Sequence, residues 1–95
     1  MDANILIIDD EKEQADAIAE SLRKVGYTCS TAVSGNNVLE IIRRDEIDVV
    51  VTDLVMQEID GMRILRETKE NSPETEVILI TGHGSVETSV TAMQK

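Results

Sequence analysis

The sequence has almost no aromatic residues: among 95 residues there is one Tyr and no Trp or Phe. A core must therefore be built from Ile, Val, Leu and Met, and there is no aromatic platform on which bases or sugars could stack. Cysteine is equally scarce. The single Cys29 excludes an intramolecular disulfide, and we interpret it as a small buried hydrophobe. This cysteine usage, an opening segment without the basic stretch of a signal peptide, and apolar runs too short to span a membrane predict a cytoplasmic protein.

Basic residues are also few, with 9 Lys and Arg against 19 Asp and Glu and a formal charge of −10. Nucleic acid is bound through clustered Lys and Arg, so we expect no direct nucleic-acid binding by this domain. The length allows one small domain and leaves no room for a second core.

Apolar runs alternate with helical stripes along the chain. Continuous Ile, Val and Leu runs are typical of strands that are buried on both faces, and a weaker run follows the first helical stripe. The predicted strands are Ile5–Ile8, Thr28–Val33, Val49–Asp53 and Val77–Ile80.

The segments between these strands show helical spacing. The first stripe ends at Gly26, the second starts from Ser34 as a plausible N-cap, the third follows a turn at Asp60-Gly61 and stops at Ser72-Pro73, and a last helix follows the fourth strand. The apolar positions of these helices are Ala15, Ile18, Leu22 and Val25; Val38, Ile41 and Ile42; Met62 and Leu65; and Val86, Val90 and Met93. Four β-then-α units predict an α/β fold in which helices cover both faces of a parallel sheet.

Polar residues follow three of the predicted strands: Asp9-Asp10, Asp53 and Thr81. Ligands of open parallel sheets bind at the carboxyl ends of the strands, so these residues should share one crevice. Two unit charges ~4 Å apart repel by about 4 kcal/mol at an effective dielectric near 20, and Mg²⁺ is the simplest ion to relieve that repulsion. A carboxylate beside such an ion can attack phosphorus, and Thr81 could hydrogen-bond a phosphoryl oxygen.

Each of these residues also has a purely structural interpretation. An Asp pair at a strand end can be a turn or a helix cap, and Thr81-Gly82 can be an ordinary strand exit. His83, which has no Cys or His partner, is interpreted as a solvated loop residue, and Met56 and Met62 as core-filling side chains.

Four segments together resemble the receiver domain of two-component response regulators: Ile5–Glu11, Asp48–Met56, Asp60–Met62 and Ile80–Gly82. The resemblance covers the whole chain in order and implies a flavodoxin-like parallel sheet with strand order 2-1-3-4. The loop from Thr81 to Gly84 is similar to receivers of the nitrogen-regulator type, which usually precede an ATPase module and a DNA-binding module.

The resemblance also implies a role for each site residue. Asp53 matches the phosphoacceptor, which takes a phosphoryl group from a histidine kinase. Asp10 matches the direct Mg²⁺ ligand and Asp9 its neighbour acting through water, while Asp53 and the backbone carbonyl of Val55 complete the metal site. Thr81 matches the switch hydroxyl. Such a domain is not an enzyme beyond slow self-catalysed phosphorylation and dephosphorylation.

The sequence departs from the family in two places. Gln57 stands where many receivers have Pro. The fifth strand, the lysine that follows it and the last helix do not occur before Lys95, so residues 1–95 are expected to form a receiver domain truncated at its C-terminal end. The fourth strand would then be an uncovered edge.

Three functions remain open at this point. The first is a phosphoacceptor switch of a phosphorelay that controls an output domain in transcription regulation. The second is a signalling-incompetent interaction module of receiver fold, including a homodimer. The third is a Mg²⁺-dependent phosphohydrolase, whose signature of two Asp separated by one residue and a supporting Lys is missing here.

Overall fold

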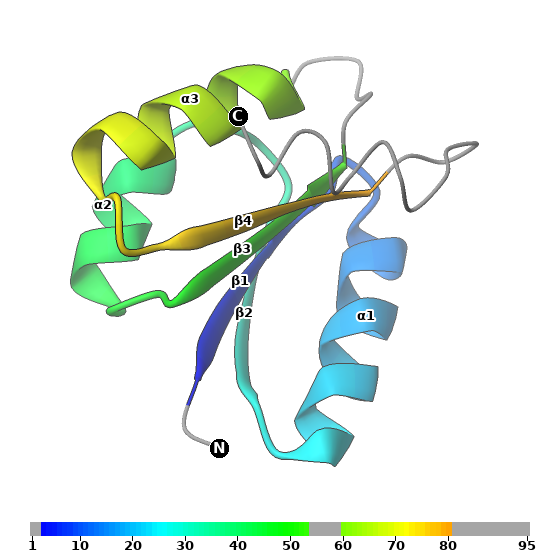
Figure 1. The fold of residues 1–95 in the computed structure, drawn as a ribbon. Coiled ribbons are helices and arrows are strands. Elements are labelled where there is room, and N and C mark those ends of the chain that lie inside the picture. The colour runs from blue at the N-terminus through cyan, green and yellow to red at the C-terminus, as the bar shows by residue number, and fades with distance from the viewer. Residues whose placement is uncertain (1–2, 54–59, 81–95) are drawn as a thin grey trace.

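A computed structural model describes residues 3–53 and 60–80, and these form a parallel sheet covered by helices on both faces (Figure 1). The strand order is β2-β1-β3-β4, as predicted, with every neighbouring pair parallel. The strands are β1 (Asn4–Ile8), β2 (Thr28–Ala32), β3 (Val49–Asp53) and β4 (Glu76–Ile80). The predicted fold class is therefore confirmed.

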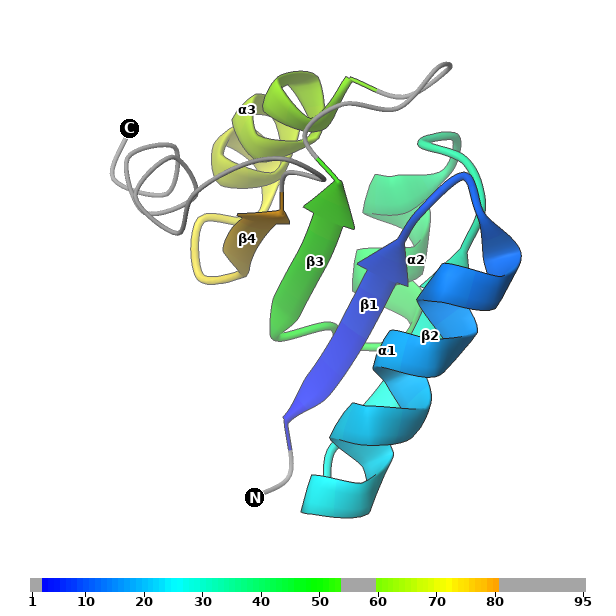
Figure 2. The same cartoon turned by 90° about the vertical axis from the view of Figure 1, so that its right-hand side faces the viewer.

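The helices divide between the two faces of the sheet, as Figures 1 and 2 show. One face is covered by α1 (Lys12–Val25), and the other by α2 (Val38–Arg44) and α3 (Gly61–Asn71). Successive side chains of a strand point to opposite faces, so β1 and β3 contribute to two cores, whereas the buried side chains of β4 belong to one of them. The α2/α3 core takes Leu6 and Ile8 from β1, and the α1 core takes Ile5 and Ile7, together with the buried Cys29.

Of two helix ends predicted from the sequence, one agrees with the structure and one does not. The first helix ends as expected at Gly26, whose φ of 112° is left-handed and whose N–H is donated to the carbonyls of Arg23 and Leu22. The predicted N-cap of the second helix is wrong: Asn37 occupies the N-cap position of α2, with a φ of 64° and no capping hydrogen bond from its side chain. Ser34 instead accepts the backbone N–H of Asn36 at 3.3 Å, which closes a turn before the helix.

Two predicted core positions are also wrong. Met62 is 39% exposed, because α3 turns Gly61, Ile64, Leu65 and Thr68 toward the sheet and Met62 lies to one side of that stripe. Val25 is 72% exposed at the last residue of α1, where the chain turns away. The turn predicted at Asp60-Gly61 is the start of α3, where the Asp60 carboxylate accepts the N–H groups of Met62 and Arg63.

The amino edge of the sheet is fastened by hydrogen bonds between β1 and the loop that precedes β3. The Asn4 backbone N–H is donated to Asp48 Oδ2 at 2.8 Å, and the Asn4 side-chain amide reaches the carbonyls of Asp45 and Glu46 at 3.2 Å each. The backbone N–H of Asp48 returns a bond to the Asn4 carbonyl at 2.8 Å. These contacts fix β1 against the start of β3.

The loop between α3 and β4 is tied to the same edge. The buried hydroxyl of Thr75 is donated to the Ile47 carbonyl at 3.2 Å and lies 2.7 Å from Ser72 Oγ. Lys69 Nζ donates a hydrogen bond to the Thr75 carbonyl at 2.8 Å. Thr68 differs from these groups, since its buried Oγ1 has no hydrogen-bond partner within the described residues.

None of the helices in residues 3–53 and 60–80 combines the length and the apolar character needed to cross a membrane. The predicted last helix, with Val86, Val90 and Met93, lies outside the described residues, as does His83.

Candidate functional site

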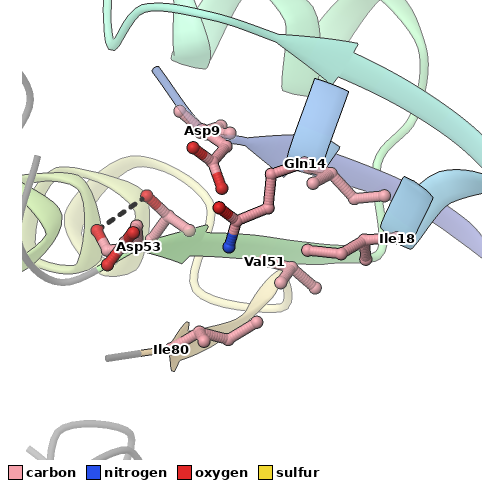
Figure 3. Close-up of a pocket in the computed structure, with 9 residues that line it drawn as sticks. Asp9, Gln14, Ile18, Val51, Asp53 and Ile80 are labelled. Carbon is pink, nitrogen blue, oxygen red and sulfur yellow. Dashed lines mark hydrogen bonds between the residues drawn. The ribbon is translucent and has the colours of Figure 1, made fainter. Parts of the chain in front are cut away.

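Asp9 and Asp53 line one crevice at the carboxyl edge of the sheet. The register pairs Ile8 with Thr52, so the residues that follow on β1 and β3 lie opposite one another. The crevice measures about 10 Å³, which is room for roughly one water molecule. Its lining residues are Ile7, Ile8, Asp9, Gln14, Ile18, Val51, Thr52, Asp53 and Ile80, as drawn in Figure 3.

Asp9 is the more buried of the two carboxylates, with 4% of its surface exposed. Its Oδ1 accepts the backbone N–H of Glu11 at 2.9 Å, and its own N–H is donated to the Ala32 carbonyl at 3.0 Å. Burial raises the pKa of Asp9, and the neighbouring carboxylates of Asp53 and Asp10 raise it further, while the bond from Glu11 opposes the shift. Negative charge is therefore costly at this position.

Asp53 is half-buried at the last position of β3. Thr52 Oγ1 is donated to the Asp53 carbonyl at 3.3 Å, and Asp53 pairs in register with Ile80 of β4. Asp10 is exposed, and its carboxylate acts on the pKa of Asp9. The structure thus brings Asp9 and Asp53 together at one crevice, whereas Asp10, which was predicted to share it, is not one of its lining residues.

The acidic residues fit a hard divalent cation in one respect. Mg²⁺ is commonly bound through one or two carboxylates while it keeps several waters, and Asp9 and Asp53 supply such a pair. Within residues 3–53 and 60–80, no three His, Cys, Asp or Glu side chains are arranged as a set that could hold a metal ion. The two remaining predicted site residues, Val55 and Thr81, lie outside the described residues.

Two lining residues lie outside the segments that resemble the family and were not predicted as part of a site: Gln14 and Ile18. Gln14 and Ile18 are four residues apart, which places them on the same side of α1. That spacing was a usable signal for Ile18, which belongs to the predicted apolar stripe. It was weaker for Gln14, which is exposed and polar in the first turn of the helix.

Two curated proteins with related sequences are named as transcriptional regulatory proteins. The chain is 36% identical over 93 residues to the transcriptional regulatory protein GlrR of Escherichia coli K12, an alignment that covers 98% of this chain and 21% of GlrR. It is 36% identical over 91 residues to the transcriptional regulatory protein ZraR of the same strain, with 96% of this chain and 21% of ZraR covered. The chain thus spans about a fifth of the length of these relatives.

Solved structures share the fold. A response regulator receiver domain protein from Clostridium thermocellum superposes with a TM-score of 0.82 at 40% identity, over 97% of this chain and 75% of that one. NtrX from Brucella abortus, solved in complex with ATP, gives a TM-score of 0.85 at 35% identity, over 99% of this chain and 22% of that one. The beryllofluoride-activated NtrC4 receiver domain dimer gives 0.81 at 36% identity, with 96% and 75% covered.

The sequence matches the family described as the response regulator receiver domain over residues 5–95. The fold, the strand order and the relatives agree with that match, and they confirm the resemblance noted from the motifs. The chain belongs to the response regulator receiver domain family.

Proposed function

We propose that this domain is the phosphoacceptor switch of a two-component phosphorelay, with Asp53 as the acceptor. The observation that carries the proposal is the position of Asp53 at the end of β3, beside Asp9 in a crevice at the carboxyl edge of a receiver sheet. The donor would be a histidine kinase.

The transfer itself requires little of the protein beyond positioning. A carboxylate oxygen of Asp53 forms a bond to phosphorus, while the bond from phosphorus to the donor's imidazole nitrogen breaks and its electron pair leaves with the imidazole. The product is an aspartyl phosphate, which slowly loses its phosphoryl group to water. The domain acts as a substrate of the kinase, with at most slow catalysis of its own phosphorylation and dephosphorylation.

The family resemblance assigns a Mg²⁺ site to the carboxylates of Asp9, Asp10 and Asp53 and the backbone carbonyl of Val55. Among these, Asp9 and Asp53 line the crevice and are the pair that would hold the ion. When bound, the ion would offset the charge of the carboxylates and of the transferred phosphoryl group. The raised pKa of Asp9 and its burial beside Asp53 support this assignment. A cation at that position would offset the free-energy cost of holding two negative charges close together in a buried place.

The relatives support an output in transcription. GlrR and ZraR are named as transcriptional regulatory proteins and are about five times as long as the matched segment, so we propose that the domain controls an output module in transcription. In that scheme Thr81 supplies the hydroxyl that moves toward the phosphoryl group. The receiver dimer of NtrC4 supports a homodimer as the assembly.

The test is phosphoryl transfer to the protein expressed from its complete gene, with Mg²⁺ and acetyl phosphate as donor. We expect wild type to gain the mass of one phosphoryl group and Asp53→Asn to gain none. Asp16→Asn is a matched control, because it makes the same chemical change on α1 outside the crevice. A wild type that gains no mass, or an equal gain on Asp53→Asn, would reject the proposal.

A Mg²⁺ titration followed by amide chemical shifts separates this function from an interaction module that does not signal. Shifts at Asp9, Asp10 and Asp53 are expected for the switch. Unchanged amides at all three positions would favour the interaction module.

A further inference from the structure

Gln14 lies where it can contact a group carried by Asp53. It is the third residue of α1, in the turn that packs beside the end of β1, and it lines the same crevice as Asp9 and Asp53. Figure 3 shows its side chain extending from α1 into this crevice. Gln14 is exposed and Asp53 is half-buried, so both reach the mouth of the crevice, where an added phosphoryl group would project.

The Gln14 side-chain amide does not form the capping hydrogen bond that its helix position allows, nor any other within the described residues. A Gln at this helix position often accepts the backbone N–H of the N-cap residue. Here the N-cap is Glu11, and its N–H is donated to Asp9 Oδ1 at 2.9 Å instead. The Gln14 backbone N–H is donated to the Glu11 carbonyl at 3.1 Å, whereas the side-chain amide makes no hydrogen bond within residues 3–53 and 60–80.

The crevice otherwise offers a phosphoryl group mainly negative charge. Asp9 and Asp53 are carboxylates, and the Thr52 hydroxyl is donated to the Asp53 carbonyl. Among the described lining side chains, Gln14 is the one that carries N–H groups. Phosphoryl oxygens accept hydrogen bonds and donate none when ionised, so a neutral N–H donor is the group that this part of the site would use to recognise them.

We propose that the Gln14 side-chain amide donates a hydrogen bond to a phosphoryl oxygen as that group is transferred to Asp53 and while it remains there. The inference rests on the proposed phosphoacceptor function and adds a substrate-contacting residue from α1. Because charge spreads over the non-bridging oxygens in the transition state, a donor held at one of them accelerates transfer.

The first test compares rates of phosphorylation by acetyl phosphate with Mg²⁺ in the protein expressed from its complete gene. Gln14→Met keeps the length and helix propensity of the side chain and removes the donor. We expect it to slow phosphorylation by about three- to tenfold, the effect of one neutral hydrogen bond. Gln14→Glu places a like charge beside the phosphoryl group, and we expect it to slow the reaction by more than about tenfold. Ser21→Glu adds the same charge at an exposed position of α1 outside the crevice, and we expect it to retain the wild-type rate.

The second test needs no turnover. Beryllofluoride with Mg²⁺ is added to ¹⁵N-labelled protein, and the side-chain NH₂ signal of Gln14, assigned by its loss in Gln14→Met, is followed. A shift of that signal, absent when Asp53→Asn is used, is expected. An unchanged Gln14 signal in wild type while the Asp53 amide shifts would overturn the contact.

The outcomes separate the two proposals. If wild type cannot be phosphorylated, the phosphoacceptor function fails and the role of Gln14 fails with it. If wild type is phosphorylated and both Gln14 variants react at its rate, the phosphoacceptor function stands and the role of Gln14 is wrong.

Discussion

The two edges of the sheet treat polar groups in opposite ways. At the amino edge, the side chains of Asn4, Thr75 and Lys69 donate hydrogen bonds to backbone carbonyls. These bonds hold the connecting loops against β1 and β3. At the carboxyl edge, Asp9 is buried beside the carboxylate of Asp53, with Asp10 adding a further charge. One edge therefore contributes stability, and the other carries an electrostatic cost that a ligand can relieve.

This contrast explains how a small domain can hold a charged site. The strands are anchored at one end and by two apolar cores, so the opposite end can keep Asp9 and Asp53 close together although they repel. Functional sites commonly retain such unfavourable arrangements while the rest of the fold supplies the stability. The contrast makes quantitative predictions at both edges.

The largest expected effect is at the fastened edge. Thr75→Val preserves shape but removes the hydroxyl that serves the Ile47 carbonyl and Ser72, so we expect the free energy of unfolding to fall by about 2 kcal/mol. Thr68→Val is the matched control, because the hydroxyl it removes is buried without a partner in the described part of the chain. It should leave stability unchanged or raise it by about 1 kcal/mol. Urea unfolding of both variants measures the difference, and equal losses would show that the Thr75 bonds contribute nothing specific.

At the acidic edge, Mg²⁺ should stabilise the domain. At a concentration ten times its Kd, the ion should raise the free energy of unfolding by about 1.4 kcal/mol if it binds only the folded state. The increment should shrink in Asp9→Asn, since the ion and the substitution relieve the same repulsion. Thermal unfolding with Mg²⁺ and with a chelator measures the effect. If Mg²⁺ stabilised Asp9→Asn as much as wild type, the ion would not act on the charge of Asp9.

Asp9→Asn alone should stabilise the domain at neutral pH. The amide oxygen still accepts the Glu11 N–H, and the charge is removed from a buried position, so we expect a gain of about 1 kcal/mol, or roughly 4–8 °C in Tm. The pKa of Asp9 is raised in the folded state, so the cost of its charge is fully present above that raised pKa. It decreases as the pH falls through the raised pKa and is gone below the ordinary value of 3.8. The difference in Tm between wild type and Asp9→Asn should therefore shrink on acidification, and a difference that grows would contradict this sign.

The smallest effects come from a pair of lysines, one for each edge. Lys69→Ala should cost about 1 kcal/mol, because Lys69 Nζ is donated to the Thr75 carbonyl and lies 3.5 Å from a Glu76 carboxylate oxygen. Lys12 forms an exposed pair with Asp16, with side chains 74% and 48% exposed, so Lys12→Ala should cost less than about 0.5 kcal/mol. Both substitutions remove one positive charge from an acidic chain. If urea unfolding showed a larger loss of stability in Lys12→Ala than in Lys69→Ala, the proposed difference between the two edges would be wrong.

Much of this arrangement could be predicted from the sequence. Runs such as Ile5–Ile8 are unambiguous because both faces of the strand are buried, and the parallel order then brings the residues after β1 and β3 to one edge. The cap at Asn37 could not be predicted, since Ser and Asn are equally good N-cap residues by type and the use of the Ser34 hydroxyl in the preceding turn is a local structural feature. The position of Gln14 depends on how α1 packs against β1, and that packing is a tertiary feature which helical spacing does not encode.

The pairing of Ile8 with Thr52 ties the integrity of the site to that of the cores. If β1 slipped by one residue, Leu6 and Ile8 would exchange places with Ile5 and Ile7, and each core would receive side chains shaped for the other. The same slip would carry Asp9 out of line with Asp53. A one-residue insertion or deletion within β1 should therefore abolish folding and the alignment of Asp9 with Asp53 together, so a scan of such variants should yield no folded protein whose carboxylates are misaligned.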